Sequence, residues 1–333
     1  MSEVLDHILA SVSPASIAQA TGATQRLLRA GLTEDNGGLC ALAARLCAAR
    51  HSPSPALERR TVLVVAADHG VASPGIELGD NHPTVVGLRL MAEGGAAINS
   101  AARSADAQLV LVDVGVRGAE DFDLGRGVLS FRQGNGTADF SKEPAMRMDE
   151  AVASVETGIA LLFSLADAGL DMLALGQLST GSQPASLAIV CALTGAAPTE
   201  LSAKDGALVE AALAMHGLEG ASPLEILAAV GGFDLGVMTG LLLGAASIHV
   251  PVVLDGHGTS AAALLAHALH PEVRGYLFAS HAGGMPGHAR ALASLGLEPL
   301  FAVGLGQSEG TGALLAMPML DAAARVLAEA GAS

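Results

Sequence analysis

Residues 61–70 read TVLVVAADHG, a mainly apolar run that ends directly in Asp68, His69 and Gly70. Five more apolar runs follow along the chain: QLVLVDV (108–114), DMLALG (171–176), VPVVLD (250–255), GYLFAS (275–280) and PLFAVGL (299–305). Segments of helical length separate the runs, and continuous apolar strands are typical of a parallel sheet covered by helices. The sequence therefore predicts an α/β fold with a doubly wound, mostly parallel sheet and helices on both faces.

The residues before this first run have a different pattern. Three Ala- and Leu-rich segments, Val4 to Ala20, Thr24 to Ala30 and Leu39 to Ala49, predict helices, and the Pro-containing HSPSP at 51–55 ends them. We therefore predict a small helical region at 1–60 and an α/β domain at 61–333 that carries the site. The C-terminal helix could return to the helical region.

Composition narrows the classes of partner. Hydrophobic residues make up 51% of the 333 residues, which is enough for a large core. Aromatic residues make up only 2%, and 17 Lys and Arg against 33 Asp and Glu give a formal charge of −16. Such a surface repels phosphate backbones and anionic lipids and offers few rings for base stacking. We expect a small-molecule ligand, with no nucleic acid and no membrane as partners.

Three features predict a cytoplasmic protein. The cysteines Cys40, Cys47 and Cys191 are odd in number and lack CxxC spacing, as expected of free thiols in a reducing compartment. The first residues, MSEVLDHILASVSP, carry acids and no basic region, unlike a secretory signal. The apolar stretch from Leu235 to Leu254 is interrupted by His249 and Pro251. We interpret that stretch as a buried helix and strand, not as a membrane span.

Polar residues and glycines follow the predicted strands. In a parallel sheet the carboxyl ends of the strands meet at one edge, where ligands bind. The residues at these ends are Asp68-His69-Gly70, Asp113 and Gly115, Gly176-Gln177, Asp255-Gly256-His257, Ser280-His281, and Gly304 to Gly312. Ordinary turn chemistry would explain any single Asp-Gly, but the whole set predicts one shared small-molecule site.

A metal centre is a weaker alternative. Its ligands would come from Asp68, His69, His82, Asp255, His257, His281 and His288, but no pair has HxxxH or HExxH spacing. The chain also lacks a Walker A motif and a GxGxxG after a strand. We predict no metal and no cofactor, and a hydrolase or metal-dependent enzyme built on the His and Asp residues remains the least favoured hypothesis.

The segment SEGTGALLAMPML (308–320) contains the candidate catalytic group. Glu309 precedes a predicted helix, and Gly310 and Gly312 free the backbone to approach a ligand. A partly desolvated carboxylate there would have a raised pKa and could act as a general base. Alternatively, the helix dipole would stabilise the carboxylate and lower its pKa. The residues alone leave both possibilities open.

Several motifs resemble a known family in order and spacing. They are DHGV (68–71), GGAAIN (94–99), VDVGV (112–116), GNGTADF and EPAM (134–146), VGGFDLGVMTG (230–240), PVVLDG (251–256), SH with PGH (280–288), and LGLEPL with EGTGA (295–313). The chain thereby resembles nicotinate-nucleotide:dimethylbenzimidazole phosphoribosyltransferases of cobalamin lower-ligand synthesis. The resemblance implies a doubly wound sheet with a small helical domain from the chain ends, a homodimer, and Glu309 as the base that takes the benzimidazole proton.

The chain departs from the family pattern at several positions. Gln177 replaces a glutamate and Pro184 lies in the same loop, TELSAKDG (199–206) stands in place of GRGTG, and Gly306-Gln307-Ser308 stands in place of Arg-Leu-Gly. Glu77, Gly79-Asp80 and Val86-Gly87 alter the base-binding stretch, His257-Gly258 replaces Phe-Ile, and Met285 replaces a glutamate. A transferase with a changed ligand and a paralogue that binds a small molecule without transfer are both consistent with these changes.

The resulting site prediction has one catalytic residue, Glu309. The predicted substrate-binding residues are Asp68, His69, Gly70, Glu77, Asp80, Gly176, Gln177, Ser182, Asp255, His257, Ser280, His281, Gly310 and Thr311. The predicted ligands are an aromatic base and a nucleotide donor.

Overall fold

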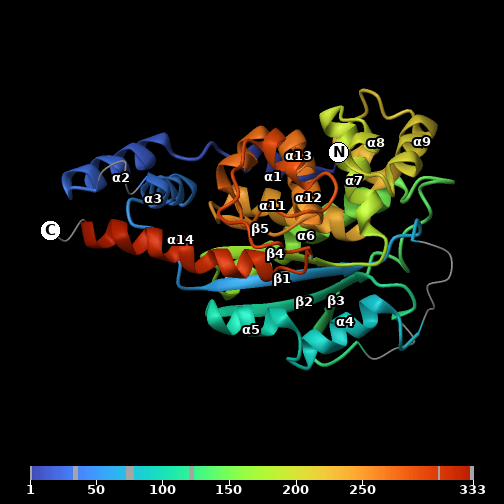
Figure 1. Cartoon of the computed structure of the whole chain (residues 1–333), viewed down its shortest axis with the longest axis horizontal. Helices are drawn as coiled ribbons and strands as arrows, with labels where there is room; N and C mark the ends of the chain where they lie inside the picture. The colour runs from blue at the N-terminus through green and yellow to red at the C-terminus, as the bar shows by residue number, and fades with distance from the viewer. Residues whose placement is uncertain (1, 33–36, 73–78, 120–123, 307, 331–333) are drawn as a thin grey trace.

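A computed structural model describes residues 2–32, 37–72, 79–119, 124–306 and 308–330 (Figure 1). Its centre is a six-stranded sheet of order β3-β2-β1-β4-β5-β6 in which every neighbouring pair is parallel. The strands are β1 (Arg60–Ala67), β2 (Ala107–Gly115), β3 (Val128–Ser130), β4 (Met172–Leu178), β5 (Val252–Leu254) and β6 (Leu277–Ala279). The predicted parallel α/β fold is confirmed, and the strand order reverses between β1 and β4.

Helices cover both faces of the sheet (Figure 1). The face below the sheet in that view carries α4 (Pro83–Ala92) and α5 (Ala97–Ser104). The other face carries α6 (Met148–Ala168), α11 (Phe233–Ser247) and α12 (His257–Leu269). Further helices between the N-terminal and C-terminal helices are α7 (Ser182–Thr194), α8 (Pro198–Leu201), α9 (Gly206–His216), α10 (Pro223–Val230), a 3-10 helix (Pro271–Tyr276) and α13 (His288–Leu295).

Helix α11 is the central core helix. It packs along α6 and also contacts β1 and β2. A Cβ atom on Gly240 would overlap the backbone of Val155, and one on Gly158 would overlap that of Val237, so glycine permits this close helix contact. The interpretation of residues 235–254 as a buried helix and strand is confirmed, because α11 is buried and β5 follows it.

The N-terminal residues form α1 (Glu3–Ser11), α2 (Ile17–Arg29) and α3 (Gly37–Ala49). The prediction of one helix from Val4 to Ala20 is wrong, since the chain leaves the helix around Pro14. Proline lacks an N–H and disfavours helix in the residue before it. Ser16 then caps α2 by accepting a hydrogen bond from the Gln19 N–H at 3.3 Å.

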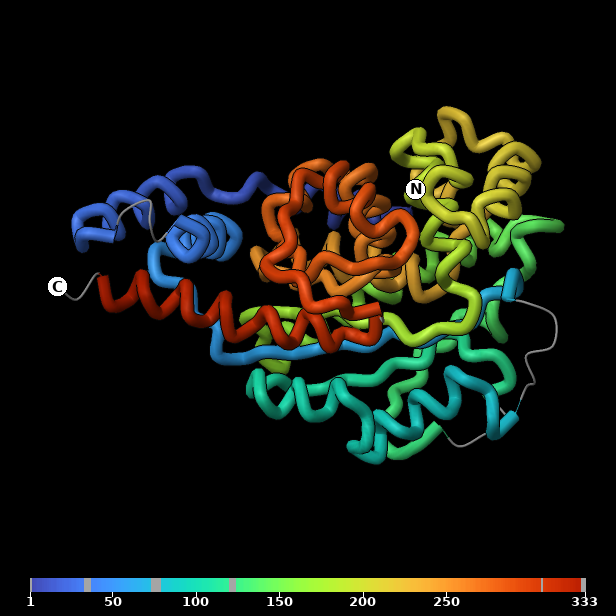
Figure 2. The backbone as a smooth tube through the Cα atoms, in the orientation of Figure 1, coloured from blue at the N-terminus to red at the C-terminus, as the bar shows by residue number. Residues whose placement is uncertain are grey.

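The C-terminal helix α14 (Thr311–Ala330) runs back along the N-terminal helices (Figure 2). It contacts α3 and α2 and also packs against α5, β4 and β5. Helices α6 and α14 are long and apolar enough to cross a membrane by length and composition alone. Both pack on other parts of this fold. The division into domains at residue 60 stays a prediction.

Two strand assignments differ from the sequence prediction. Residues 299–305 form no strand, and only an isolated bridge pairs Phe301 with His281. The segment lies at the surface, with Val303 60% exposed, so its apolar residues do not fill a sheet. The short edge strand β3 was not predicted, because three partly exposed residues give no apolar run.

Candidate active site

The strands β1, β4, β5 and β6 are consecutive neighbours in the sheet, so their carboxyl ends lie side by side along one edge. The strand order reverses between β1 and β4. Asp68, Gln177, Asp255 and Ser280 are the buried polar residues at these ends. This edge is where doubly wound sheets bind ligands. The structure therefore brings together most of the residues that the sequence pattern placed in one site.

Glu309 is held over the ends of β4 and β5. The Gln177 N–H donates to the Ser308 carbonyl at 2.6 Å, and the Gly310 N–H donates to Asp255 Oδ2 at 2.9 Å. The Ala313 N–H donates to Asp255 Oδ1 at 2.8 Å. Asp255 thus accepts hydrogen bonds from the start of α14, where helices carry unpaired N–H groups. Glu309 lies between these fixed points.

The two carboxyl groups here have shifted pKa values. Burial raises the pKa of Glu309 above its ordinary value. Burial also raises the pKa of Asp255 to about 7, although N–H groups of Gly310, Ala313 and Gly312 act to lower it. The raised pKa of Glu309 favours the interpretation as a general base. A carboxylate stabilised by the helix dipole would have a lowered pKa instead.

Gly176 lets the Glu309 segment approach the sheet. A Cβ atom on Gly176 would overlap the Glu309 carbonyl. Gly70 is similar, since its Cβ would overlap the backbone of Thr137 and Ala138. Both glycines were predicted to bind substrate; in the structure they make close backbone contacts that place loops.

Gly176→Ala should therefore displace Glu309. We expect the catalytic rate to fall by about 100-fold, the effect of moving a catalytic group by about 1 Å. Gly22→Ala is the matched control, because Gly22 lies within α2 with nothing near its Cβ position. That control should keep full activity and gain about 0.5–1 kcal/mol of stability. Steady-state rates and thermal melts measure both, and an active Gly176→Ala enzyme would contradict the assignment.

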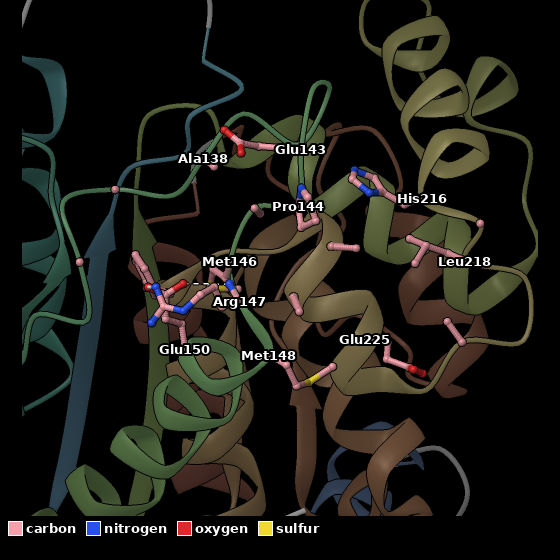
Figure 3. Close-up of a pocket in the computed structure, with 18 of the residues that line it drawn as sticks. Ala138, Glu143, Pro144, Met146, Arg147, Met148, Glu150, His216, Leu218 and Glu225 are labelled. Carbon is pink, nitrogen blue, oxygen red and sulfur yellow. Dashed lines mark hydrogen bonds and ion pairs between the residues drawn. The ribbon is translucent and has the colours of Figure 1, made fainter.

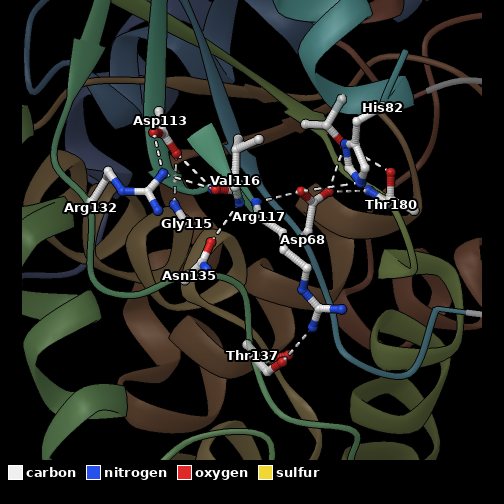
Figure 4. Close-up of polar contacts among 12 residues, drawn as sticks. Asp68, His82, Asp113, Gly115, Val116, Arg117, Arg132, Asn135, Thr137 and Thr180 are labelled. Atoms are coloured by element: carbon white, nitrogen blue, oxygen red, sulfur yellow. Dashed lines mark hydrogen bonds and ion pairs between the residues drawn. The ribbon is translucent and has the colours of Figure 1, made fainter. Parts of the chain in front are cut away.

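Asp68 joins the start of α4 to the loops after β2 and β4 (Figure 4). Its Oδ1 accepts from the Thr84 hydroxyl at 2.6 Å and from the Thr180 N–H at 3.1 Å. Its Oδ2 accepts from the Arg117 N–H at 2.8 Å, and His82 Nε2 lies 3.7 Å away. Both oxygens of this carboxylate thus accept hydrogen bonds from other parts of the chain, and these contacts hold the surrounding segments together.

A second carboxylate, Asp113, has the same kind of role at the end of β2 (Figure 4). Its Oδ1 accepts from the N–H groups of Gly115 and Val116 at 2.9 and 2.8 Å, and Arg132 pairs with Oδ2 at 2.9 Å. Arg132 also donates to the Val116 carbonyl. These contacts fix the loop that leads to residues 134–136.

His69, Gln177 and Asp234 form a buried polar group beneath the site. His69 Nε2 lies 3.0 Å from Asp234 Oδ1, and Gln177 Nε2 donates to Asp234 Oδ2 at 2.8 Å. Burial acts most strongly on the pKa of His69 and lowers it, but the charge and hydrogen bond of Asp234, together with Asp68 and the Gly231 backbone, raise the pKa overall. Burial acts to raise the pKa of Asp234, but His69 and Gln177 lower it. Sequence reasoning missed Asp234, although its place after Gly231-Gly232-Phe233 was a signal.

Burial disfavours the charged form of three further histidines near the strand ends, His257, His281 and His288. Burial lowers the pKa values of His257 and His288 to about 4 and also lowers that of His281. His281 Nδ1 lies 3.0 Å from the Ser280 hydroxyl, and His257 Nδ1 lies 2.8 Å from the Ser308 hydroxyl. Within the described ranges, no group of three or more His, Cys, Asp or Glu residues could hold a metal ion.

The loop after β4 was expected to hold phosphate. Gly181 has φ +84° and precedes α7, so Ser182 and Gln183 present N–H groups at a helix start, while Pro184 has none to present. Gln183 Nε2 donates to Asp205 Oδ2 at 3.1 Å. This contact places the 199–206 segment beside the loop, so two segments that depart from the family pattern touch each other.

The base-binding stretch lies only partly within the described residues, and Glu77 lies outside them. The Asp80 side chain is 74% exposed and pairs with Arg89 at 2.7 Å. Gly87 on α4 packs against Leu178 at the end of β4. Thr311 opens α14, next to Gly310. The structure therefore places Asp80 at the surface, apart from the buried residues.

A separate cavity of about 770 Å³ lies between the 134–148 segment and helices α9 and α10 (Figure 3). Charged side chains at it include Glu143, Arg147, Glu150 and Glu225. None of the predicted site residues lines this cavity. We therefore place the candidate active site at the strand ends around Glu309.

Comparison with known proteins agrees with this geometry. A family model described as phosphoribosyltransferase matches residues 14–332. A nicotinate-nucleotide–dimethylbenzimidazole phosphoribosyltransferase of Roseiflexus sp. (strain RS-1) is 38% identical over 98% of this chain and 95% of its own length. The chain belongs to the nicotinate-nucleotide–dimethylbenzimidazole phosphoribosyltransferase family.

Other members of this family agree in sequence and in fold. The enzyme of the same name from Desulforudis audaxviator (strain MP104C) is 40% identical over 82% of this chain and 80% of its own length. The crystal structure of nicotinate-nucleotide–dimethylbenzimidazole phosphoribosyltransferase from Thermus thermophilus superimposes with a TM-score of 0.82. It is 35% identical and covers 94% of this chain and 98% of that one. The predicted family resemblance is confirmed.

Proposed function

We propose that this protein transfers the phosphoribosyl group of nicotinate mononucleotide to dimethylbenzimidazole or a related aromatic base and releases nicotinate. The observation that carries the proposal is the position of Glu309. Its carboxyl is half-buried and has a raised pKa, and hydrogen bonds to Ser308 and Gly310 hold its backbone at the ends of β4 and β5. Membership of this family and a candidate general base at that place together support transfer of a phosphoribosyl group from one ring nitrogen to another.

The chemistry follows from the properties of the two rings. The unprotonated ring nitrogen of the benzimidazole attacks C1′ of the ribosyl group and forms the new C–N bond. The bond from C1′ to the pyridine nitrogen breaks, and its electron pair leaves with nicotinate. The other ring nitrogen of the benzimidazole loses its proton to the Glu309 carboxylate. A raised pKa suits this step, because a base is most effective when its pKa lies near the working pH.

The alternative of a paralogue without transferase activity drew its support from Gln177 and from the 199–206 segment. Gln177 donates a side-chain hydrogen bond to Asp234 and a backbone hydrogen bond to Ser308. It therefore helps to hold the Glu309 segment. Glutamine in place of glutamate at this position is therefore compatible with an ordered Glu309 segment. Transferase activity remains the better-supported function.

The direct test supplies the purified protein with nicotinate mononucleotide and dimethylbenzimidazole and follows products by mass spectrometry. We expect equal amounts of nicotinate and of the benzimidazole ribonucleotide. Nicotinate release without the ribonucleotide would indicate hydrolysis. The absence of both products, with other benzimidazoles and purines also tried as acceptors, would contradict the proposal.

We also propose that the protein is a cytoplasmic homodimer that acts on small molecules and not on nucleic acid. The family resemblance and the acidic composition support this proposal. Light scattering at micromolar concentration should give twice the mass of the 33.1 kDa chain. A monomer at that concentration would contradict the dimer.

The phosphate of the donor should contribute little to its binding. Pro184 supplies no N–H in the first turn of α7, and Asp205 brings a carboxylate near that turn. Each missing charge-assisted hydrogen bond is worth about 1.5–3 kcal/mol, so two would weaken nucleotide binding by about 100-fold or more. We expect nicotinate mononucleotide and its dephosphorylated nucleoside to bind this protein with nearly equal affinity in calorimetry. A clear preference for the nucleotide would mean that other groups, such as Lys204 or Ser182, bind the phosphate.

A further inference from the structure

The turn after β5 holds the Glu309 segment from both sides. Asp255 accepts hydrogen bonds from the N–H groups of Gly310 and Ala313, which follow Glu309. His257 Nδ1 lies 2.8 Å from the hydroxyl of Ser308, which precedes Glu309. A Cβ atom on Gly256, between them, would overlap the Ser308 side chain. Residues 255–257 and 308–310 therefore fit together as two short complementary segments.

Four departures from the family pattern lie in this one place. Ser308 and His257 bond to each other, and the Gln177 N–H donates to the Ser308 carbonyl. The Gln177 side chain occupies the space that a Cβ atom on Gly258 would need. These four residues therefore contact one another in the wall beside Glu309.

We propose that His257 is a positioning residue for the transfer reaction, which holds the Glu309 carboxylate in place through its hydrogen bond to Ser308. This inference rests on the proposed function. His257 acts through Ser308, and we assign it no contact with the reacting atoms. This hydrogen bond joins the start of α12 to the segment before α14. Asp255 thus holds the residues that follow Glu309, and His257 holds the residue that precedes it.

The surroundings favour a neutral imidazole in this role. His257 and Ser308 are 7% and 6% exposed, so water does not compete for their hydrogen bond. Burial holds the pKa of His257 low, the charge of His69 acts in the same direction, and the charge of Asp234 acts against them. The segment GQSEG (306–310) has the G-x-S-x-G pattern of hydrolase nucleophiles. Here the serine hydroxyl is buried and engaged with His257.

A double-mutant cycle tests the inference. His257→Phe and Ser308→Gly, which restore the family residues one at a time, should each lower kcat by about 10- to 100-fold with little change in KM, since a shift of about 1 Å at a catalytic group has effects of this size. The double variant should be no slower than either single variant. His257→Asn keeps a hydrogen-bonding atom near the Nδ1 position and should recover most of the rate, and Ser308→Ala should behave like Ser308→Gly. Additive losses, or equal rates for the Asn and Phe variants, would overturn the proposal.

A measurement without substrate separates this inference from the proposed function. Carbon-13 NMR of labelled glutamate should follow the titration of Glu309, identified by its loss in Glu309→Gln. The titration midpoint of Glu309 should move in His257→Phe and stay near the wild-type value in His257→Asn. Asp255 is an ionisable neighbour of Glu309 that is present in all variants, so its influence is common to the comparison. Wild-type protein that makes no transfer product would refute the proposed function. An unmoved Glu309 midpoint in His257→Phe would refute the positioning role.

Discussion

Glu309→Gln should lower kcat for phosphoribosyl transfer by about 10²- to 10⁴-fold, because an amide cannot take the proton that leaves the attacking ring. The melting temperature should stay within a few degrees of wild type. Hydrogen bonds hold the backbone on either side of Glu309, and its half-buried carboxyl, whose pKa is raised, is not stabilised by an ion pair in the described residues. Steady-state kinetics and thermal melts of the same preparations measure both effects.

The pH profile provides a second measurement of the same group. Glu309 accepts a proton only when it is ionised, so kcat/KM should fall as pH falls through its pKa. Because burial raises that pKa, the loss should occur at a higher pH than for a solvent-exposed glutamate. Glu309→Asp retains a carboxylate and should keep part of the rate. Full activity in Glu309→Gln, or a rate independent of pH on the acid side, would rule out Glu309 as the base.

Asp234→Ala should destabilise the protein by about 3–5 kcal/mol, since removal of one partner from a buried ion pair leaves the other charge without compensation. His69 would lose its partner 3.0 Å away, and the Gln177 side chain would lose its acceptor. Asp80→Ala is the matched control. It breaks an ion pair with Arg89 whose acid is 74% exposed, and such pairs contribute about 0–1 kcal/mol. Denaturant unfolding of both variants gives the comparison.

The contribution of this buried pair should depend on pH in two directions. The pKa of His69 is raised in the folded state, so its contribution is complete below the unfolded value of about 6.5 and is lost as pH rises through the folded value. The pKa of Asp234 is lowered, so its contribution is complete above about 3.9 and is lost as pH falls through the folded value. The difference in unfolding free energy between wild type and Asp234→Ala should therefore be largest in mildly acidic solution. A difference below about 1 kcal/mol there, no more than an exposed pair contributes, would contradict the importance of the pair.

The sequence predicted the sheet well wherever burial leaves a continuous apolar run. Residues 61–67, 108–114 and 171–176 match β1, β2 and β4 closely, because strands covered on both faces need apolar residues at every position. The same rule failed for residues 299–305, none of whose apolar side chains is fully buried. It also missed β3, which is too short to form a pattern. Local composition thus predicts a strand only when the final fold buries it.

The position of the site was also determined by the sequence, since parallel strands bring their carboxyl ends to one edge and the polar residues follow those ends. The sequence identified Glu309 as the candidate base. What each neighbouring side chain does was decided by the tertiary structure. Asp68 and Asp255 bind backbone N–H groups from loops distant in the chain, and Gln177 contacts Asp234 and Ser308. Hydrogen bonds depend on distance and direction between atoms, and strand ends separated by many residues reach those distances only when the sheet has formed. The sequence therefore determines which polar groups meet at the strand ends. Only the folded chain decides which of these groups are hydrogen-bonded to each other and which, like the proposed base Glu309, are left without such a partner in the described residues.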